Sequence, residues 1–98
     1  MTDKQQIDPV ELSQSLIRCK SVTPDQGGAL DLIQSILEGN GFNCIRLPFK
    51  DENFPEVDNL FATWGEKAPN LCFAGHIDVV PPGERNQWDE DPFSGKIK

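Results

Sequence analysis

The chain has 98 residues, which is enough for one small domain with a modest core and too few for two. Nine basic residues stand against sixteen acidic ones, so the net charge is −7 at pH 7. A chain of this charge has no electrostatic footprint for nucleic acid and is repelled from an anionic membrane surface. No apolar run approaches the roughly 20 residues that span a membrane, and residues 1–6 lack the apolar core of a secretory signal. We therefore expect a globular cytoplasmic protein that binds neither nucleic acid nor membrane.

The first expected element is a helix that follows a loose polar leader. Asp8 is a favourable N-cap residue, Pro9 suits the first helical position, and Glu11 lies three residues past the cap. Apolar residues then recur at helical spacing, namely Leu12, Leu16, Ile17 and Cys19. We expect this helix to run to about residue 19.

A turn and a second helix come next. The proline in segment 21–25 favours extended backbone before it, so the segment is either a simple connection between helices or a loop at the edge of an active site. Apolar residues recur at helical spacing again over 28–38, and the Gly-Asn-Gly sequence at 39–41 suits a helix end. The pattern predicts two consecutive helices.

Three strands are expected after the helices, at 42–47, 59–64 and 71–75. The first alternates in polarity, and the last opens an uninterrupted apolar run that is typical of a strand buried on both faces of a parallel sheet. The acidic segment 48–58 contains two prolines. We expect it to be an exposed connection whose carboxylates are solvated rather than metal ligands.

The segment 71–83 carries the pattern that points most directly to chemistry. It contains the only histidine of the chain, His76, with Asp78 two residues later and a Pro-Pro-Gly break behind them. Residues i and i+2 of a strand project from the same face, roughly 6.5–7 Å apart, so both side chains can enter one cleft while Ile77 turns to the core. A metal-bound histidine usually donates its second ring N–H to a carboxylate. Asp78 is thus a partner of His76, a ligand itself, or part of an incidental pair.

Other side chains fit a metal site less well. The cysteines, at positions 19, 44 and 72, are widely spaced and odd in number, so we expect no disulfide framework and three small buried apolar side chains. Along a strand Cys72 lies about 13 Å from His76, too far to share a zinc ion with bonds of about 2.1–2.3 Å. The consecutive acids 89–91 cannot all converge on one ion and are expected on the surface.

A longer set of residues extends the pattern around His76 and Asp78. It comprises Phe73-Ala74-Gly75-His76-Ile77-Asp78-Val79-Val80-Pro81-Pro82-Gly83, followed by Trp88 and Pro92-Phe93, and preceded by Ser21-Val22-Thr23-Pro24, Gly39-Asn40-Gly41-Phe42 and Asn59-Leu60-Phe61-Ala62. Together these resemble the M20 family of metal-dependent peptidases and deacylases, most closely its branch that acts on succinylated diaminopimelate. The resemblance runs from about residue 10 to residue 97. Ile77 departs from the branch, which usually has threonine there, but its side chain should face away from the site.

The resemblance implies an α/β fold. Residues 1–98 would form the N-terminal portion of a zinc-peptidase-like α/β catalytic domain, with two helices and then strands of a mixed sheet, and the rest of that domain and the dimerisation domain would be absent. His76 matches a zinc ligand, and Asp78 matches the catalytic aspartate beside it. The family binds a pair of Zn²⁺ ions, with Co²⁺ as a substitute. The remaining ligands and a glutamate base belong to motifs that would follow Lys98.

The activity that the resemblance implies is metal-dependent amide hydrolysis. The substrate would be N-succinyl-L,L-2,6-diaminopimelate, from which a homodimeric enzyme removes succinate in lysine and diaminopimelate biosynthesis. Two alternatives remain: another member of the family, such as an acetylornithine deacetylase or a dipeptidase, or an inactive fragment with no enzymatic role. Since most of the site would be missing, we expect the isolated 98-residue chain to be inactive.

Overall fold

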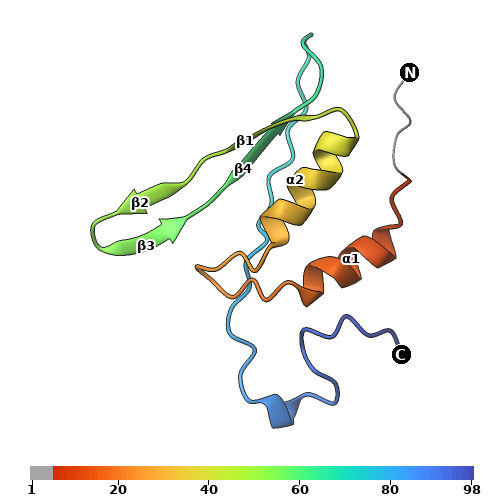
Figure 1. The fold of residues 1–98 in the computed structure, drawn as a ribbon, viewed down its shortest axis with the longest axis vertical. Coiled ribbons are helices and arrows are strands. Elements are labelled where there is room, and N and C mark those ends of the chain that lie inside the picture. Colours follow the sequence, from red (N-terminus) through yellow and green to blue (C-terminus); the bar gives the residue numbers. More distant parts are fainter. Residues whose placement is uncertain (1–5) are drawn as a thin grey trace.

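The computed structural model describes residues 6–98, so the expected leader lies, up to residue 5, outside the described residues. Two helices, α1 (Pro9–Arg18) and α2 (Ala29–Gly39), precede two small antiparallel sheets (Figure 1). The expected α/β class is confirmed at this level. Neither helix of the described part of the chain has the length and apolar character that crossing a membrane requires.

The start of α1 follows from its capping residues. Asp8 Oδ1 accepts hydrogen bonds from the backbone N–H groups of Val10 (2.9 Å) and Glu11 (3.4 Å). These amides have no partner within a helix, so the cap satisfies donors that would otherwise need water. Pro9 occupies the first helical position, where its missing N–H costs nothing. The predicted start is therefore confirmed, and Cys19 caps the other end.

The buried apolar residues of the described chain lie at the start of α2. They are Ala29 and Leu30, and the rest of the apolar face of α2 is half-buried where the helix packs on β1 and β4. The helix begins after Gly28, which adopts a left-handed conformation (φ 87°), and ends at Asn40, whose side chain donates to the carbonyl of Ile36. The predicted span of 28–38 is confirmed within one residue.

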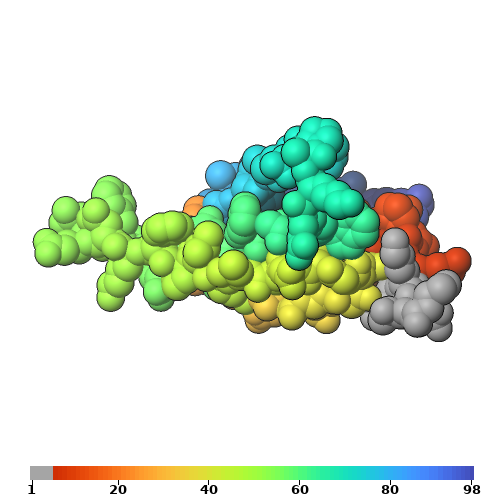
Figure 2. Space-filling view, turned by 90° about the horizontal axis from the view of Figure 1, so that it is seen from above, coloured from red at the N-terminus to blue at the C-terminus, as the bar shows by residue number. Residues whose placement is uncertain are grey.

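The four strands form one long hairpin. Their bounds are β1 Asn43–Arg46, β2 Phe49–Asp51, β3 Phe54–Val57 and β4 Leu60–Thr63. The strand β1 pairs antiparallel with β4 from Asn43–Thr63 to Arg46–Leu60, and β2 pairs antiparallel with β3. In Figure 1 β1 continues into β2 and β3 into β4, and Figure 2 shows the yellow-green tip of this hairpin reaching away from the rest of the molecule.

The expectation that 48–58 is a connection without strands is wrong. The segment contains β2 and β3, although every residue of both strands is exposed as expected. The turn between them is stabilised by Asp51, whose Oδ1 accepts from the Asn53 N–H at 2.9 Å. Aspartate and asparagine favour such turns because their side chains bond to backbone two residues on. Acidic residues and a proline at an edge do not prevent pairing when a tight turn brings the two arms together.

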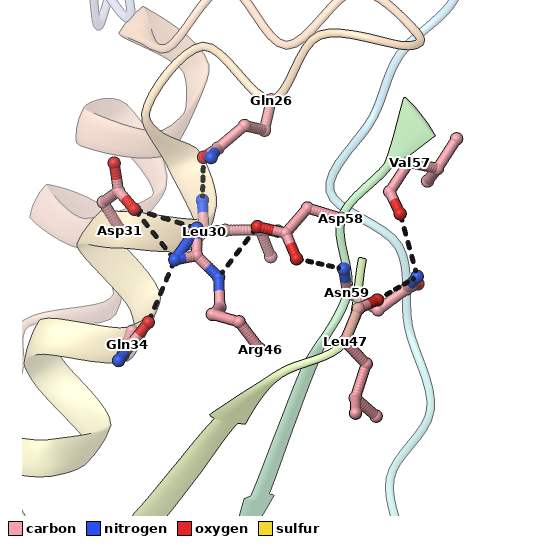
Figure 3. Close-up of polar contacts among 9 residues, drawn as sticks. All are labelled: Gln26, Leu30, Asp31, Gln34, Arg46, Leu47, Val57, Asp58 and Asn59. Carbon is pink, nitrogen blue, oxygen red and sulfur yellow. Dashed lines mark hydrogen bonds and ion pairs between the residues drawn. The ribbon is translucent and has the colours of Figure 1, made fainter. Parts of the chain in front are cut away.

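Arg46 joins the hairpin to α2 (Figure 3). Its guanidinium donates to Asp31 from Nη2 (2.8 Å) and Nη1 (3.0 Å), and Nη1 also donates to Gln34 (3.0 Å). On the other side Nε lies 3.3 Å from Asp58 Oδ2, in an ion pair without hydrogen-bond geometry. Asp58 is thus no metal ligand within this structure, but it is half-buried in an ion pair rather than freely solvated as expected.

The expected strand at 71–75 is also wrong. Residues 68–78 adopt no regular structure, and the exposed fractions of Leu71 and Phe73 are 82% and 88%. An apolar run becomes a buried strand only where neighbouring strands and helices cover it, and residues 6–98 provide none. The expected mixed sheet fails for the same reason: both sheets are antiparallel, and the parallel pairing found in the described chain is an isolated bridge between Val22 and Val79.

The segment after the hairpin returns to α1. It contains the short 3₁₀ helix η1 (Arg85–Gln87) and then meets α1 through two side chains, with Gln14 donating to the Gly95 carbonyl (2.7 Å) and Arg18 to the Ser94 carbonyl (3.0 Å). The whole arrangement is open. Its radius of gyration is 16.0 Å, whereas a compact domain of about 100 residues has about 13 Å. The helices and strands of the described chain therefore do not enclose a core, which agrees with the small number of buried residues.

Candidate functional site

The structure brings His76 and Asp78 together in the extended backbone before the Pro-Pro-Gly break. His76 Nδ1 lies 3.0 Å from Asp78 Oδ1 and 2.9 Å from the backbone oxygen of the same residue. No strand is needed for this contact, because extended residues two apart already project to one side. The pair predicted from the spacing is therefore present, in a segment whose predicted strand is not.

The two acceptors around Nδ1 determine where the imidazole carries its proton. A backbone carbonyl can only accept, so Nδ1 is the protonated nitrogen of the neutral ring and Nε2 is left with its lone pair. The side chain of His76 is 84% exposed, and its hydrogen bonds within residues 6–98 are made by Nδ1, which leaves Nε2 open. An imidazole held through Nδ1 by a carboxylate with Nε2 open is the arrangement of a metal-binding histidine.

The turn at 21–23 lies directly beside this pair. Val22 and Val79 form a parallel bridge, in which the Val79 N–H donates to the Ser21 carbonyl (2.9 Å) and the Thr23 N–H donates to the Val79 carbonyl (3.1 Å). Of the two readings of this turn, the structure therefore favours a loop at the edge of the candidate site. Ser21, which the sequence pattern includes in a motif without assigning it a role, donates its hydroxyl to the Ile77 carbonyl at 2.7 Å.

A hollow of about 440 Å³ opens next to the pair. Residues of α1, of 77–82 and of 88–93 line it, and they are mostly apolar, with His76 and Ser21 among the few polar groups. Trp88 joins the two ends of the loop 82–88, since its indole N–H donates to the Pro82 carbonyl at 3.0 Å. The histidine thus faces an apolar space large enough for a small ligand or for further protein.

The donors of the described chain fit one ligand of a metal site and not a whole site. Nowhere in residues 6–98 do three His, Cys, Asp or Glu side chains gather as a metal ion requires, and a catalytic zinc takes about three protein ligands. The acids 89–91 are surface residues as expected: Glu90 pairs with Lys96 at 3.1 Å, and Asp91 Oδ1 accepts from the Phe93 N–H at 2.8 Å. Within residues 6–98, His76 with Asp78 therefore stays a prediction of one ligand and its partner.

Of the three cysteines, Cys19 lines the hollow beside His76, and none contacts the His76–Asp78 pair through a hydrogen bond within the described residues. All three are free, so the expected absence of a disulfide within the described chain is confirmed. Cys19 and Cys44 are half-buried, whereas Cys72 is exposed, which contradicts the expectation of a buried residue. Burial raises the pKa of the Cys44 thiol, and the negative charge of Glu38 raises it further. Cys44 is accordingly a weak nucleophile at neutral pH, because the reactive species is the thiolate.

Comparison with known proteins places these residues in context. No protein-family model matches the chain, so the wider M20 family stays a prediction. The chain is nevertheless similar to curated proteins of the deacylase class, whose name says that they remove a succinyl group. They carry the name succinyl-diaminopimelate desuccinylase, and the predicted resemblance to this branch is confirmed.

The similarity is high but covers a limited part of these relatives. The chain is 58% identical over 90 residues to the protein of Rhodospirillum centenum, 50% identical over 91 residues to that of Parvibaculum lavamentivorans, and 51% identical over 92 residues to that of Ehrlichia canis. These matches include 92%, 93% and 94% of this chain. The chain spans about a quarter of the length of each relative, 23% of the first two and 24% of the third.

Proposed function

We propose that this chain is part of a succinyl-diaminopimelate desuccinylase, which hydrolyses the amide of N-succinyl-L,L-2,6-diaminopimelate in lysine and diaminopimelate biosynthesis. The observation that carries the proposal is the identity of 50–58% to relatives of that name over more than nine-tenths of the chain. The geometry of His76 and Asp78 supports it independently, because an oriented imidazole with an open nitrogen suits metal-assisted hydrolysis.

In this proposal His76 would hold one ion of a zinc pair through Nε2, and cobalt could replace zinc. Zinc supplies a Lewis acid that polarises an amide carbonyl and makes water more acidic. Asp78 keeps the proton on Nδ1 and fixes the plane of the ring, so that Nε2 points in one direction. The His76 side chain is 84% exposed and lies at the edge of the apolar hollow. Residues 6–98 bring no three such ligands together, so in this proposal the general base and the other ligands would come from elsewhere in the enzyme.

The proposal extends to the setting of the enzyme. Amide hydrolysis in amino-acid synthesis belongs in the cytoplasm, and we propose a homodimer that acts on a small anionic substrate without nucleic-acid or membrane partners. The charge of −7 is of the same sign as the carboxylates of that substrate, so the groups that bind them must come from another part of the enzyme. Such groups are not assigned to any residue of this chain.

The site assignment is tested by substituting His76 and Asp78 in the intact enzyme. His76→Ala should lower kcat/KM by about a hundredfold or more and reduce bound zinc, because a ligand is lost. Asp78→Asn should cost about 10- to 100-fold in zinc affinity, since the backbone oxygen still accepts from Nδ1 but the carboxylate charge is gone. Asp89→Asn is the control, as that side chain is 95% exposed. Normal zinc content and rate in His76→Ala would show that the histidine is structural.

The substrate assignment is tested separately by steady-state kinetics. The intact enzyme should hydrolyse N-succinyl-L,L-diaminopimelate much faster than N-acetylornithine or a dipeptide, and a chelator should abolish turnover. Preference for an acetylated substrate would replace this proposal by the deacetylase alternative. The 98-residue chain alone should show no turnover with any of these substrates, because it offers a single oriented ligand. Chelator-sensitive turnover by the isolated chain would contradict that expectation.

A further inference from the structure

Ser21 is the one buried polar residue of the described chain. Its exposed fraction is 3%, whereas His76 beside it is exposed and Asp78 is half-buried. A hydroxyl removed from water has to recover its hydrogen bonds within the protein, or the burial costs free energy. Ser21 recovers its donor bond at a single place, the carbonyl oxygen of Ile77, at 2.7 Å.

That carbonyl belongs to the residue between the histidine and the aspartate. The peptide plane that contains it also contains the backbone nitrogen of Asp78, so a bond to the Ile77 carbonyl fixes the plane from which Asp78 departs. Two residues further on, the Val79 N–H donates to the Ser21 carbonyl at 2.9 Å. Ser21 therefore forms hydrogen bonds to the residues on both sides of Asp78, to Ile77 with its hydroxyl and to Val79 with its backbone carbonyl.

The surroundings give Ile77 and Asp78 little other support. Segment 71–78 pairs with no strand in the described chain, and its residues 71–76 are exposed, whereas Ile77 and Asp78 are half-buried. The two acceptors that hold His76 Nδ1, the backbone oxygen and Oδ1, both belong to Asp78. Any rotation of the plane before Asp78 therefore moves both acceptors together and turns the imidazole with them.

A role for Ser21 as a nucleophile does not fit these contacts. A serine nucleophile is activated by a base within hydrogen-bond reach, and the hydroxyl proton of Ser21 is directed to a backbone carbonyl, which is no base. Ser21 lines the hollow beside His76, but its exposed fraction is 3%, so little of it is open to a molecule bound there. The hydroxyl acts on the backbone of the motif, not on a reacting bond.

We propose that Ser21 is a positioning residue for the His76–Asp78 pair, and that its hydroxyl sets the direction of His76 Nε2 towards a divalent metal ion. The proposal rests on the proposed function for its metal, and it adds a residue from the loop between the helices to the candidate site. Removal of a group that orients a ligand typically lowers metal affinity or activity 10- to 100-fold.

The test compares two variants of equal shape in the intact enzyme. Ser21→Thr and Ser21→Val both add volume at a buried position, but only threonine keeps the hydroxyl. We expect zinc affinity, measured by competition with a chromophoric chelator, to be 10- to 100-fold weaker in the valine variant than in the threonine variant, with unchanged far-ultraviolet circular dichroism. Ser21→Ala should resemble the valine variant, and kcat should fall more than KM rises, because the lost hydrogen bond to the Ile77 carbonyl orients a metal ligand and does not itself bind substrate.

A matched control is available on α1. The Ser13 hydroxyl donates to the Pro9 carbonyl at 2.7 Å, the same length as the Ser21 bond, but it is exposed and belongs to a helix. Ser13→Ala should leave zinc affinity unchanged. Equal zinc affinity in Ser21→Thr and Ser21→Val would overturn the proposal, and so would loss of folding in both variants that lack the hydroxyl, which would assign the group to folding alone. Failure of the wild-type enzyme to release succinate would overturn the proposed function instead, because zinc binding is measured without substrate.

Discussion

Two adjacent glycines before α2 allow a sharp test of how the loop between the helices is packed. Gly27 and Gly28 both have positive φ, 57° and 87°. An alanine in this left-handed region costs about 1–2 kcal/mol at either position. The two sites differ in the space around the missing side chain, so comparison of their alanine variants cancels the shared conformational cost.

The space differs sharply. A Cβ on Gly27 would lie 2.6 Å from the Lys20 carbonyl carbon and oxygen and 2.7 Å from the Lys20 nitrogen, whereas a Cβ on Gly28 would meet nothing within 4 Å. All three clashing atoms are backbone, so no side chain can rotate away and the loop itself must shift. Overpacking of this kind typically costs about 1–3 kcal/mol. We therefore expect Gly27→Ala to be less stable than Gly28→Ala by about 1–3 kcal/mol.

Amide hydrogen exchange in the intact protein measures this difference locally. The Leu32 N–H donates to the Gly28 carbonyl and the Leu30 N–H donates to the Gln26 side chain, so both amides report opening of the first turn of α2. A difference of about 1–3 kcal/mol corresponds to about 5- to 150-fold faster exchange in Gly27→Ala than in Gly28→Ala. Equal exchange in the two variants would refute the close approach of Gly27 to Lys20.

Two further predictions concern the sheet and its helix. Arg46→Ala should lower the free energy of unfolding by about 1–2 kcal/mol. Asp58→Asn should lower it more than Asp31→Asn, because the side chains of Asp58 and Asp31 are 28% and 69% exposed and exposed ion pairs contribute little. Urea denaturation measures both effects, and a larger loss in Asp31→Asn would contradict the second prediction. Alkylation of Cys44, followed by mass spectrometry of its peptide, should need a higher pH than alkylation of an ordinary thiol, since burial and Glu38 raise the pKa of Cys44. Glu38→Gln should lower the pH at which half of Cys44 is alkylated. If wild-type Cys44 is half alkylated at the pH of an ordinary thiol, the thiol is not buried as described.

Local signals in the sequence sufficed for the helices. The cap formed by Asp8 and the position of Pro9 depend on neighbours within one turn, and both were correctly predicted. The hairpin tip was missed although a local signal existed, because the Asp-Glu-Asn sequence at 51–53 between two phenylalanines is a turn signal. The strand at 71–75 failed for a different reason: pairing depends on partner strands, and an apolar run cannot show whether they are present.

The same distinction applies to the candidate site. His76 and Asp78 are two residues apart, so their contact follows from extended geometry and could be predicted. The contact between Ser21 and Ile77 spans 56 positions, and no periodicity relates such distant residues. The hollow beside His76 is likewise assembled from α1 and the segment 88–93, which meet only through the folded arrangement.

The exposed apolar segment 71–78 has a consequence for self-association. Unpaired N–H and C=O groups on an extended backbone are a template on which another copy can add as a strand, and the apolar side chains of Leu71 and Phe73 strengthen that tendency. Pro81 and Pro82 follow directly, and a proline cannot donate to a growing ladder. The two prolines therefore limit the stretch over which such strand addition can extend.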